Sequence, residues 1–471
     1  MSVPPNRQGP TSTPDQDDHA LPQSFDAIVV GSGPGGATVA RELARRGQKV
    51  LILERGEGAR VTGSMTQTLR ELWMPGRSLF VTDRLLAVLR GVTVGGSSIY
   101  FFGTAWEPPY ELFSKHGIDL RPQVAEAKRE LPITPLPAEL MGPSARRVMD
   151  SAVELGYDWQ PLAKYFDQQR LGGAPMGSYG VPSYEAKWNA RMFVEEAVSL
   201  GATLVTGARA RRVLVEDGVA KGVEFVSAGK TQTALGSTVV VAAGGIGSPV
   251  LLRASGIDQA GRSLFCDPVV VVTGSLPGPG HGQELPMTAG VLLEEEGYTL
   301  TDVSVPQWLY WLIAAEVGRV DKLWSYRRAA AILVETRDDP NGWVTRRGGI
   351  RKPFTQGDRH RLAQGTQRAR KILTNAGAER LCRSWLFAVQ PGGTVPIGRL
   401  LDADLRTEVD NLYVCDASVI PDPWGLPPSL TLIGLGKRLA GHLAGRSSGR
   451  LAGASEQPPA RPADQQPRSA R

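Results

Sequence analysis

The stretch SFDAIVVGSGPGGATVARELARRGQKVLILERG, residues 24–56, decides the fold of this chain. An apolar run, AIVV, leads into three glycines with the spacing G-x-G-x-x-G, a helical pattern follows, and a second apolar run, KVLIL, ends at Glu54. This order predicts a strand, a helix and a second strand with a dinucleotide fingerprint at the first turn. Gly31 permits the tight turn, Gly33 lets the backbone approach a pyrophosphate, and Gly36 allows the helix to pack closely on the strand.

The acid at the end of the second strand completes the fingerprint. Glu54 follows Gly36 at about the spacing at which a carboxylate accepts hydrogen bonds from a ribose 2′-hydroxyl. The fingerprint fits NAD and FAD equally, so the rest of the chain must decide between them. No second fingerprint is found, and we therefore expect no built-in NAD(P)H reductase domain.

Composition is that of an ordinary globular enzyme, with 471 residues, 41% of them apolar and 21% charged. The net charge of +6 comes from Lys and Arg spread along the chain, which indicates a solvated basic surface and no nucleic-acid partner. The three cysteines have no CxxC spacing, which suits a reducing cytosol. The N-terminus lacks a signal-peptide profile, and no apolar run approaches the ~20 residues of a transmembrane segment. We therefore expect a cytoplasmic protein.

Further elements follow along the chain in a regular order. A glycine-rich turn is expected at 91–98 (GVTVGGSS). Residues 189–225 predict a helix, a short strand and a hairpin that turns at 216–218, and residues 238–257 predict a strand, a glycine turn and a helix. Residues 411–420 predict a strand that ends near Asp416, and a closing helix is expected at 431–443. A fingerprint at one end and an acid-bearing strand at the other are typical of a discontinuous FAD domain.

The chain resembles the glucose-methanol-choline (GMC) oxidoreductase family, flavoproteins that oxidise alcohols. The matching segments are GSGPGG with LERG, VGGSS, AAGGIGSP followed by LLRASGI, and QPGGTVPIG with NLYVCDASVIPDPWGLPPSLTLIGLGKRLA. Together they cover most of residues 24–445 in the family's order. The compact length and the PGGT and PPSLT segments look closer to a short branch than to the large sugar oxidases.

The resemblance implies an α/β fold with two domains. A discontinuous, Rossmann-like FAD-binding domain is expected at 24–104, 188–265 and 381–445. An α+β substrate domain backed by an antiparallel sheet is expected at 105–187 and 266–380. The ends, 1–23 and 446–471, are rich in Pro, Gln, Ser and Arg without an apolar period, and we expect disordered tails there.

The resemblance also implies which residues hold FAD. Gly31, Gly33 and Gly36 would hold the pyrophosphate and Glu54 the adenosine ribose, with Val213 placing its backbone near the adenine. The rest of the expected cofactor set lies beside the flavin ring, the ribityl chain and the pyrophosphate: Arg55, Gly95, Gly96, Ser97, Ser98, Gly244, Asp416, Ala417, Pro428, Ser429 and Leu430.

The catalytic positions depart from the family. The family places a histidine just before its GT loop and a second histidine or asparagine some forty residues later, and here those places fall at Gln390 and Pro427. Neither side chain can act as a base. Among the histidines, His281 could reach the pocket from a substrate-domain loop, along with Glu284. The others are expected to be structural or solvated.

Two segments are expected to form the substrate pocket. In 304–324, SVPQWLYWLIAAEVGRVDKLW, the side chains Trp308, Trp311, Leu312 and Ala315 fall on one face of a predicted helix. That face is interpreted as core, with an apolar substrate wall or a membrane-surface contact as alternatives. AAAILVET, residues 329–336, predicts a strand of the sheet behind the pocket.

Three functions stay open from the sequence. The first is an FAD-dependent oxidoreductase that takes hydride from a small apolar organic substrate onto flavin N5, with oxygen, a quinone or a carrier protein as electron acceptor. The second is a flavoenzyme of redox-neutral or non-alcohol chemistry, such as desaturation, isomerisation, decarboxylation or cyclisation, with Gln390 orienting the substrate. The third is a flavin-binding partner protein without turnover. No residue cluster shows metal-ligand spacing.

Overall fold

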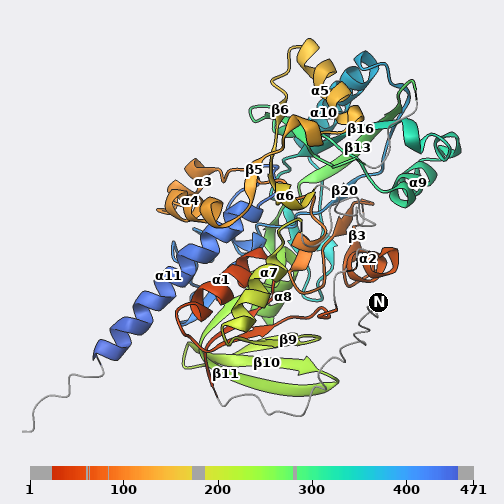
Figure 1. Cartoon of the computed structure of the whole chain (residues 1–471). Coiled ribbons are helices and arrows are strands. Elements are labelled where there is room, and N and C mark those ends of the chain that lie inside the picture. The colour runs from red at the N-terminus through yellow and green to blue at the C-terminus, as the bar shows by residue number, and fades with distance from the viewer. Residues whose placement is uncertain are drawn as a thin grey trace, which may run out of the picture.

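The computed structural model describes residues 24–59, 62, 64–82, 84–171, 186–278 and 284–453 (Figure 1). Within these residues the helices and strands form two bodies, each built on a large sheet. The lower body in Figure 1 contains the fingerprint, and the upper body contains the second sheet.

The first sheet has a parallel centre. Its seven described strands run in the order β8-β2-β1-β11-β10-β9, with β21 on the other side of β11. They are β1 (Phe25–Val30), β2 (Val50–Leu53), β8 (Thr203–Val205), β9 (Arg209–Glu216), β10 (Val219–Ser227), β11 (Lys230–Val241) and β21 (Leu412–Val414). Strand β11 pairs with β10 in its first half and lies parallel to β1 in its second half, so the hairpin and the parallel sheet are continuous.

Helices cover this sheet as the βαβ pattern predicts. Helix α1 (Pro34–Ala44) packs against α7 (Ala190–Ser199) and α11 (Ser429–Gly453), while α8 (Gly244–Ala254) lies against β9. The strands at the centre are buried on both faces, as parallel strands between helix layers are. The predicted strand, helix, strand unit is therefore confirmed, and so is the hairpin turning at 216–218.

The second sheet is mainly antiparallel. Nine described strands run in the order β3-β4-β20-β13-β16-β15-β14-β6, with β19 also paired to β13. They are β3 (Leu79–Val81), β4 (Ala87–Leu89), β6 (Gln160–Pro161), β13 (Pro268–Ser275), β14 (Ala289–Leu293), β15 (Tyr298–Asp302), β16 (Ala329–Thr336), β19 (Glu379–Arg383) and β20 (Phe387–Ala388). The strand expected at 329–336 is confirmed as β16.

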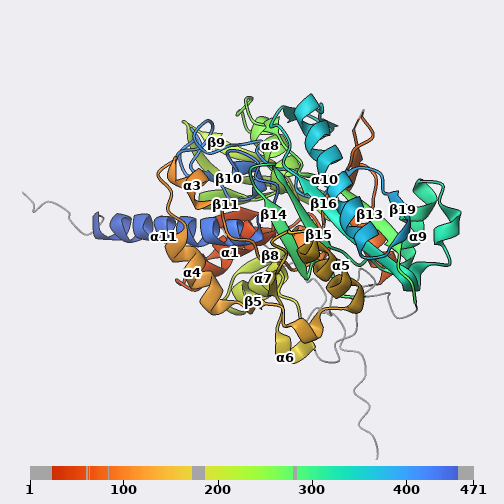
Figure 2. The same cartoon turned by 90° about the horizontal axis from the view of Figure 1, so that it is seen from above.

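The two faces of this sheet have different neighbours. Helices α5 (Pro143–Glu154) and α10 (Gln356–Asn375) lie beside β13 and β16 in Figure 2 and pack on Ile332 and Val334. Because side chains alternate along a strand, Leu333 and Glu335 point to the opposite face. That face is turned toward the first body and lines a cavity.

Smaller elements complete the chain. The remaining helices are α2 (Met65–Leu72), α3 (Tyr110–Ser114), α4 (Arg121–Glu130), α6 (Gln168–Leu171) and α9 (Gln307–Glu316), with short 3-10 turns that include η1 (Gly96–Ile99) and η5 (Ala417–Val419). The remaining strands form two small sheets: β12 (Arg262–Leu264), β17 (Gly342–Val344) and β18 (Ile350–Arg351), and β5 (Ile133–Pro135) with β7 (Ala163–Tyr165).

The strand pairing divides the chain differently from the expected domain boundaries. Strands β3, β4 and β20, which lie in segments expected in the FAD-binding domain, belong to the second sheet. In the other direction, α4 lies against α11, and Phe113, Leu120 and Val124 join the core of the first body. The short strands show no long alternating pattern, and tertiary pairing rather than local sequence places them.

Helix α9 buries the face opposite to the expected one. Its buried residues are Leu309, Tyr310, Ile313 and Ala314. Trp311 and Leu312, which were interpreted as core, are 41% and 38% exposed. The core interpretation of that face was therefore wrong. Because QWLYWLIAAE is apolar around most of the helix, its periodicity did not select one face.

The closing helix is longer than expected. Helix α11 continues to Gly453, past the boundary at 446 beyond which a disordered tail was expected. Extending an existing helix adds one backbone hydrogen bond for each residue fixed, and no proline interrupts the chain before Pro458.

Candidate functional site

A cavity of about 640 Å³ lies between the two sheets and is lined by residues of both bodies. One end is formed by the β1–α1 turn and the end of β2. The other is formed by β13, β16, β20 and α9, with apolar side chains that include Val271, Leu309, Ile313, Leu333 and Phe387. The cavity therefore joins the fingerprint to the sheet expected behind the substrate.

The fingerprint glycines have the geometry that their roles require. Gly31 has φ of +106°, and a Cβ there would lie 2.2 Å from the Ala242 carbonyl oxygen. A Cβ on Gly36 would lie 2.2 Å from the Gly31 carbonyl oxygen, so this glycine allows the close packing of α1. Gly33 has no atom within 4 Å of its Cβ position and lines the cavity, which leaves its backbone open to a ligand.

Glu54 closes the cavity beside this turn. Its Oε2 accepts hydrogen bonds from Ser32 N at 3.1 Å and Ser32 Oγ at 2.5 Å, and its Oε1 accepts one from Gly56 N at 2.6 Å. Burial raises the pKa of Glu54 although these donors favour the charged form. Since a carboxylate oxygen has two lone pairs, Oε1 retains an acceptor site for a hydroxyl group.

The second glycine turn lies against the first. A Cβ on Gly96 would lie 3.2 Å from the Gly33 Cα, and Gly95 N donates a hydrogen bond to Ser32 Oγ. Lys187 fixes the backbone that follows, since its Nζ donates to the carbonyl oxygens of Ile99 and Phe101, each at 2.8 Å. Gly96, Ser97 and Ser98 line the cavity.

Asp416 connects the last strand to α8. Its Oδ2 accepts hydrogen bonds from Gly244 N at 2.9 Å and Ser248 Oγ at 2.5 Å, and its Oδ1 accepts one from Ser418 N at 2.7 Å. Burial raises the pKa of this carboxyl group. Asp416 lines the cavity and also holds the N-terminus of α8 in place, so the structural and the cofactor interpretations both fit its position.

Most of the other residues expected to hold the cofactor line the same cavity. These are Arg55, Gly244, Ala417, Pro428 and Ser429. Gly95, Leu430 and Val213 are not among the lining residues; Val213 N donates instead to Ser255 Oγ. On strand β9 the cavity is lined by residues 208–211, which precede Val213.

Arg90 lines the cavity together with Arg55 and was missed by the sequence analysis, which included Arg55 alone. Arg90 is partly buried, donates from Nε to the Arg77 carbonyl oxygen at 3.0 Å, and lies 5.1 Å from the centre of the Phe80 ring. Burial, together with the nearby Arg55, lowers the pKa of Arg90 to about 9. Among the described residues neither Arg55 nor Arg90 has a carboxylate ion-pair partner within 4.0 Å, which makes both available to an anionic group.

At the substrate end, Gln390 contacts the only glutamate of β16. Gln390 Nε2 donates a hydrogen bond to Glu335 Oε1 at 2.5 Å, and both side chains line the cavity. Glu335 is 3% exposed, and burial raises its pKa to about 8. Gln390 Oε1 is buried without a hydrogen-bond partner among the described residues. No local pattern in the sequence predicts this pair, because Glu335 stands in an apolar strand far from Gln390 in the chain.

A second acidic group lies behind Glu335. Asp267 is buried, and burial together with the neighbouring Asp338 raises the pKa of Asp267 well above its ordinary value. Asp338 is itself paired with Lys352, at 2.7 Å and with both side chains fully buried. Glu335 also contributes to this shift, since its charge disfavours the charge of Asp267.

The two other catalytic candidates do not join this pair. His281 lies outside the described residues. The Glu284 carboxylate accepts hydrogen bonds from Ser144 N at 3.0 Å and Ala145 N at 3.2 Å, at the first turn of α5. Glu284 lines a separate small pocket and is not among the residues that line the large cavity. Its position is that of a helix cap.

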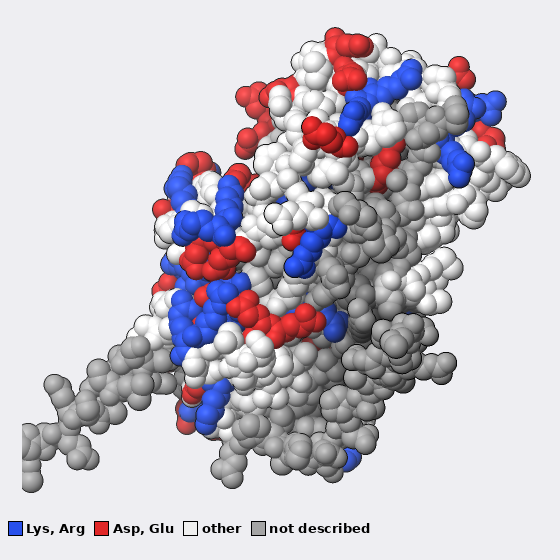
Figure 3. Space-filling model, in the orientation of Figure 1, with Lys and Arg blue, Asp and Glu red and all other residues white. Residues whose placement is uncertain are grey.

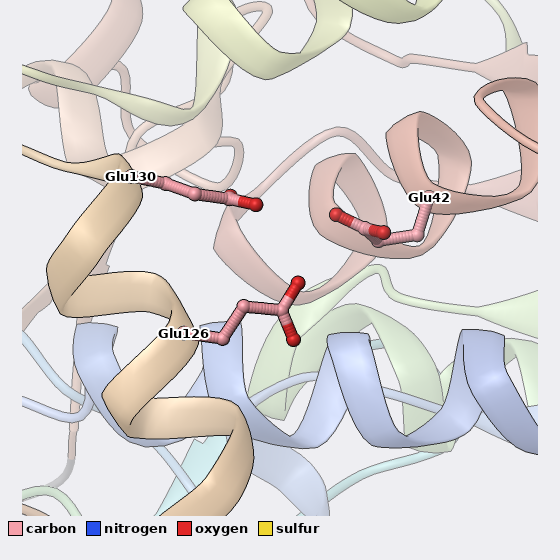
Figure 4. Close-up of side chains that lie close together, drawn as sticks. All are labelled: Glu42, Glu126 and Glu130. Carbon is pink, nitrogen blue, oxygen red and sulfur yellow. The ribbon is translucent and has the colours of Figure 1, made fainter.

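A group of three carboxylates on α1 and α4 has the spacing of a metal site (Figure 4). Lys437 Nζ lies 3.1 Å from Glu42, 2.7 Å from Glu126 and 3.0 Å from Glu130. Arg41 is also paired with Glu42 and Glu130, at 2.7 Å each. Lys437 and Arg41 thus neutralise the carboxylates. The cluster connects α1, α4 and α11, and charged side chains gather over these helices in Figure 3.

The comparisons with known proteins identify an oxidoreductase of the flavin-dependent kind. The chain belongs to the GMC oxidoreductase family: family models described as GMC oxidoreductase match residues 25–270 and 325–436. Its members are oxidoreductase enzymes that typically bind a flavin. No helix in the described part of the chain is long and apolar enough to cross a membrane.

Individual relatives are distant. A GMC-type oxidoreductase of Mycobacterium tuberculosis, itself uncharacterised, is 31% identical over 269 residues, which cover 53% of this chain and 42% of the relative. A long-chain-alcohol oxidase of Arabidopsis thaliana is 23% identical over 89% of this chain and 68% of its own length. The crystal structure of pyridoxine 4-oxidase from Mesorbium loti has a TM-score of 0.70 at 17% identity, over 88% of this chain and 98% of that one. This structural likeness supports the fold.

Proposed function

We propose that the chain binds FAD in the large cavity and oxidises a hydroxyl group of a small, apolar organic substrate. The observation that carries the proposal is the shared cavity: the fingerprint turn and the Gln390–Glu335 pair line one continuous space. The name of the long-chain-alcohol oxidase among the relatives agrees with a hydroxyl substrate.

The residues present fit a dinucleotide of this kind. Gly33 leaves its backbone open at the N-terminus of α1, where a pyrophosphate is stabilised by backbone N–H groups and the helix dipole. Arg90 and Arg55 offer cations to the same negative charge. Glu54 Oε1 retains an acceptor site for a ribose hydroxyl. When bound, FAD supplies a hydride acceptor at N5 of its ring.

The chain's own residues then have separate tasks. The apolar side chains Leu309, Ile313 and Phe387 exclude water around the substrate carbon. Glu335 accepts the hydroxyl proton while hydride leaves the carbon, so an alcohol becomes a carbonyl compound. Gln390 holds the Glu335 carboxylate by its 2.5 Å hydrogen bond and so orients it toward the substrate hydroxyl.

The test mixes the purified protein anaerobically with 1-decanol, decylamine and an unsaturated fatty acid while the visible spectrum is recorded. Bleaching of the flavin band by the alcohol alone supports the proposal. Product formation with the flavin still oxidised at the end, and without use of an acceptor, would instead establish redox-neutral chemistry. A colourless protein that takes up no FAD would overturn flavin function altogether.

Replacement of Gln390 tests the departure from the family. Gln390→His restores a titrating group before the GT loop, and we expect bleaching by the alcohol to be retained or faster. Gln390→Ala leaves Glu335 without its hydrogen-bond donor, and we expect slower bleaching. Unchanged rates in both variants would show that Gln390 has no part in the reaction.

A further inference from the structure

Exposed apolar side chains lie on and beside the elements that line the cavity. Val81 is 60% exposed, Leu85 67%, Trp385 57% and Trp324 85%. Met74, Trp311, Leu312 and Val389 are exposed to between 36% and 42%. We call these eight residues the apolar rim. Most of these residues lie on or next to α2, β3 and α9. These three segments lie on the same side of the molecule in Figure 1.

Strand pairing and a side-chain hydrogen bond bring the rim together. β20 lies parallel to β4 with Phe387 opposite Ala87, so the segments that lead into these strands, which carry Trp385 and Leu85, approach each other. Val81 is paired with Ala87 across the β3–β4 hairpin. On α9, Trp311 Nε1 donates to the Leu323 carbonyl oxygen at 2.8 Å, which places Trp324 next to the exposed face of the helix.

The rim is continuous with the interior of the cavity. Leu85, Trp385 and Val389 are exposed and also line the cavity, and Leu309 and Ile313 extend the same lining along the inner face of α9. Apolar surface therefore runs without interruption from the outside of the protein to the Gln390–Glu335 pair. Exposed apolar area of this kind, concentrated at an opening, is unusual for a surface that faces only water.

Positive charge accompanies the rim. Arg84, Arg327 and Arg383 are exposed and stand within three residues of Leu85, Trp324 and Trp385 in the sequence. None of these arginines forms an ion pair among the residues that the structure describes. Two acids lie in and near α9: Asp321, which is paired with Arg319 at 2.7 Å, and Glu316, which lines the cavity. Unpaired arginines beside tryptophans match the interface of an anionic bilayer, which attracts basic residues.

We propose that the apolar rim docks on an anionic lipid bilayer, so that an apolar substrate passes from the membrane directly into the cavity. The rim comes from four separate protruding segments, the α2 end, the β3–β4 hairpin, the loop before β20 and the α9 region. Such protrusions insert among lipid headgroups individually, as interfacial tryptophans and leucines do. The loading of substrate rests on the proposed function, whereas the docking itself does not.

The test measures co-sedimentation of the full-length, FAD-loaded protein with vesicles of phosphatidylcholine and phosphatidylglycerol. The double variant Val81→Ser/Trp324→Ser removes the two rim residues that are highly exposed and lie outside the cavity lining. We expect its partition to fall at least about tenfold. The matched control Leu200→Ser/Leu235→Ser removes two side chains that are each 47% exposed on α7 and β11, and it should bind as the unaltered protein does.

Two further measurements test separately the role of the arginines in docking and the proposed function. Arg84→Gln/Arg327→Gln/Arg383→Gln should weaken binding to these vesicles and abolish its salt dependence, with little effect on pure phosphatidylcholine. Oxidation of a short, water-soluble alcohol without vesicles reports the proposed function alone, and Val81→Ser/Trp324→Ser should retain it. Docking without oxidation would overturn only the function. Three results would overturn the docking proposal. They are no binding of the unaltered protein to vesicles, equal binding of Val81→Ser/Trp324→Ser and the unaltered protein, and a dimer of the unaltered protein that dissociates in this variant.

Discussion

Gln390 Nε2 lies 2.5 Å from Glu335 Oε1, and this contact joins the loop that lacks the family's histidine to a buried carboxyl group on the neighbouring sheet. The loop and the strand are distant in the sequence. The pair supplies the titrating group that the loop itself does not contain, because burial brings the pKa of Glu335 close to the pH at which enzymes operate.

Removal of the Glu335 carboxylate should slow the reaction without loss of the cofactor. We expect Glu335→Gln to reduce the rate of flavin bleaching by an alcohol by about 10²–10⁴-fold, the usual contribution of a general base. Stopped-flow absorbance under anaerobic conditions measures this rate. Glu284→Gln is the matched control, since Glu284 caps α5 outside the cavity. A larger loss in the control would assign the proton transfer to Glu284 instead.

The pH dependence of the rate follows from the raised pKa. Only ionised Glu335 accepts a proton, so the rate of flavin reduction should rise with pH and level off above about 8. Asp267 is a second acid near Glu335, and burial together with Asp338 raises the pKa of Asp267 well above its ordinary value. The Glu335→Gln variant should lose the step at pH 8. A profile of the unaltered protein that is flat between pH 6 and 9 would contradict this assignment.

The same pKa predicts how stability depends on pH. In the unfolded chain Glu335 releases its proton near its ordinary pKa of about 4.5, whereas the folded protein keeps it up to about 8. The folded state therefore binds more protons between these values, and stability falls as pH rises, by an amount on the order of 5 kcal/mol. Thermal unfolding of Glu335→Gln should show a Tm advantage over the unaltered protein that is larger at pH 8 than at pH 5.

Arg90 should contribute to cofactor retention. Because this partly buried cation has no carboxylate partner in the described structure, Arg90→Gln removes attraction for an anionic group without leaving a carboxylate unpaired. We expect FAD to bind about tenfold more weakly, measured by recovery of flavin fluorescence on dilution. Arg346→Gln, at an exposed pair with Asp258, should leave FAD binding unchanged. Equal retention in both variants would argue against Arg90 as a pyrophosphate contact.

The three-carboxylate cluster should depend on Lys437 and not on a metal. Burial would raise the pKa of Glu42, but Lys437 and Arg41 together lower it to about 2. Lys437→Met leaves these carboxylates in excess, and we expect a loss of about 3–5 kcal/mol in the free energy of unfolding, measured with urea. Addition of EDTA or of divalent cations should not change the Tm of the unaltered protein; stabilisation by a cation would reverse this interpretation.

The local elements of the first body could be predicted from the sequence because each has its own signal. The apolar runs before and after GSGPGG, the turn at 216–218 and the apolar strand before Gly244 specify their structures within a few neighbouring residues. Several of the residues expected to hold the cofactor also line the cavity, since they stand in those same motifs. Whether they contact FAD stays a prediction.

The catalytic pair and the buried face of α9 could not be predicted in the same way. Glu335 is one acid in AAAILVET, and its contact with Gln390 exists only because β20, β13 and β16 are neighbours in the sheet. The faces of α9 are both apolar, so the choice between them depends on what the rest of the fold packs against it. Pairing between distant strands carries no local sequence signal.

The contact between Lys437 and Glu42 spans 395 residues of sequence, and β21 enters the parallel sheet only shortly before it. During synthesis on a ribosome, the fingerprint turn is therefore made early, whereas α11, which packs against α1, is made much later. Until α11 leaves the exit tunnel, α1 lacks its main packing partner and Glu42 its lysine. Maturation of this protein is thus set by its last helix, and shortened chains that end before 429 are expected to be substrates for chaperones and proteases.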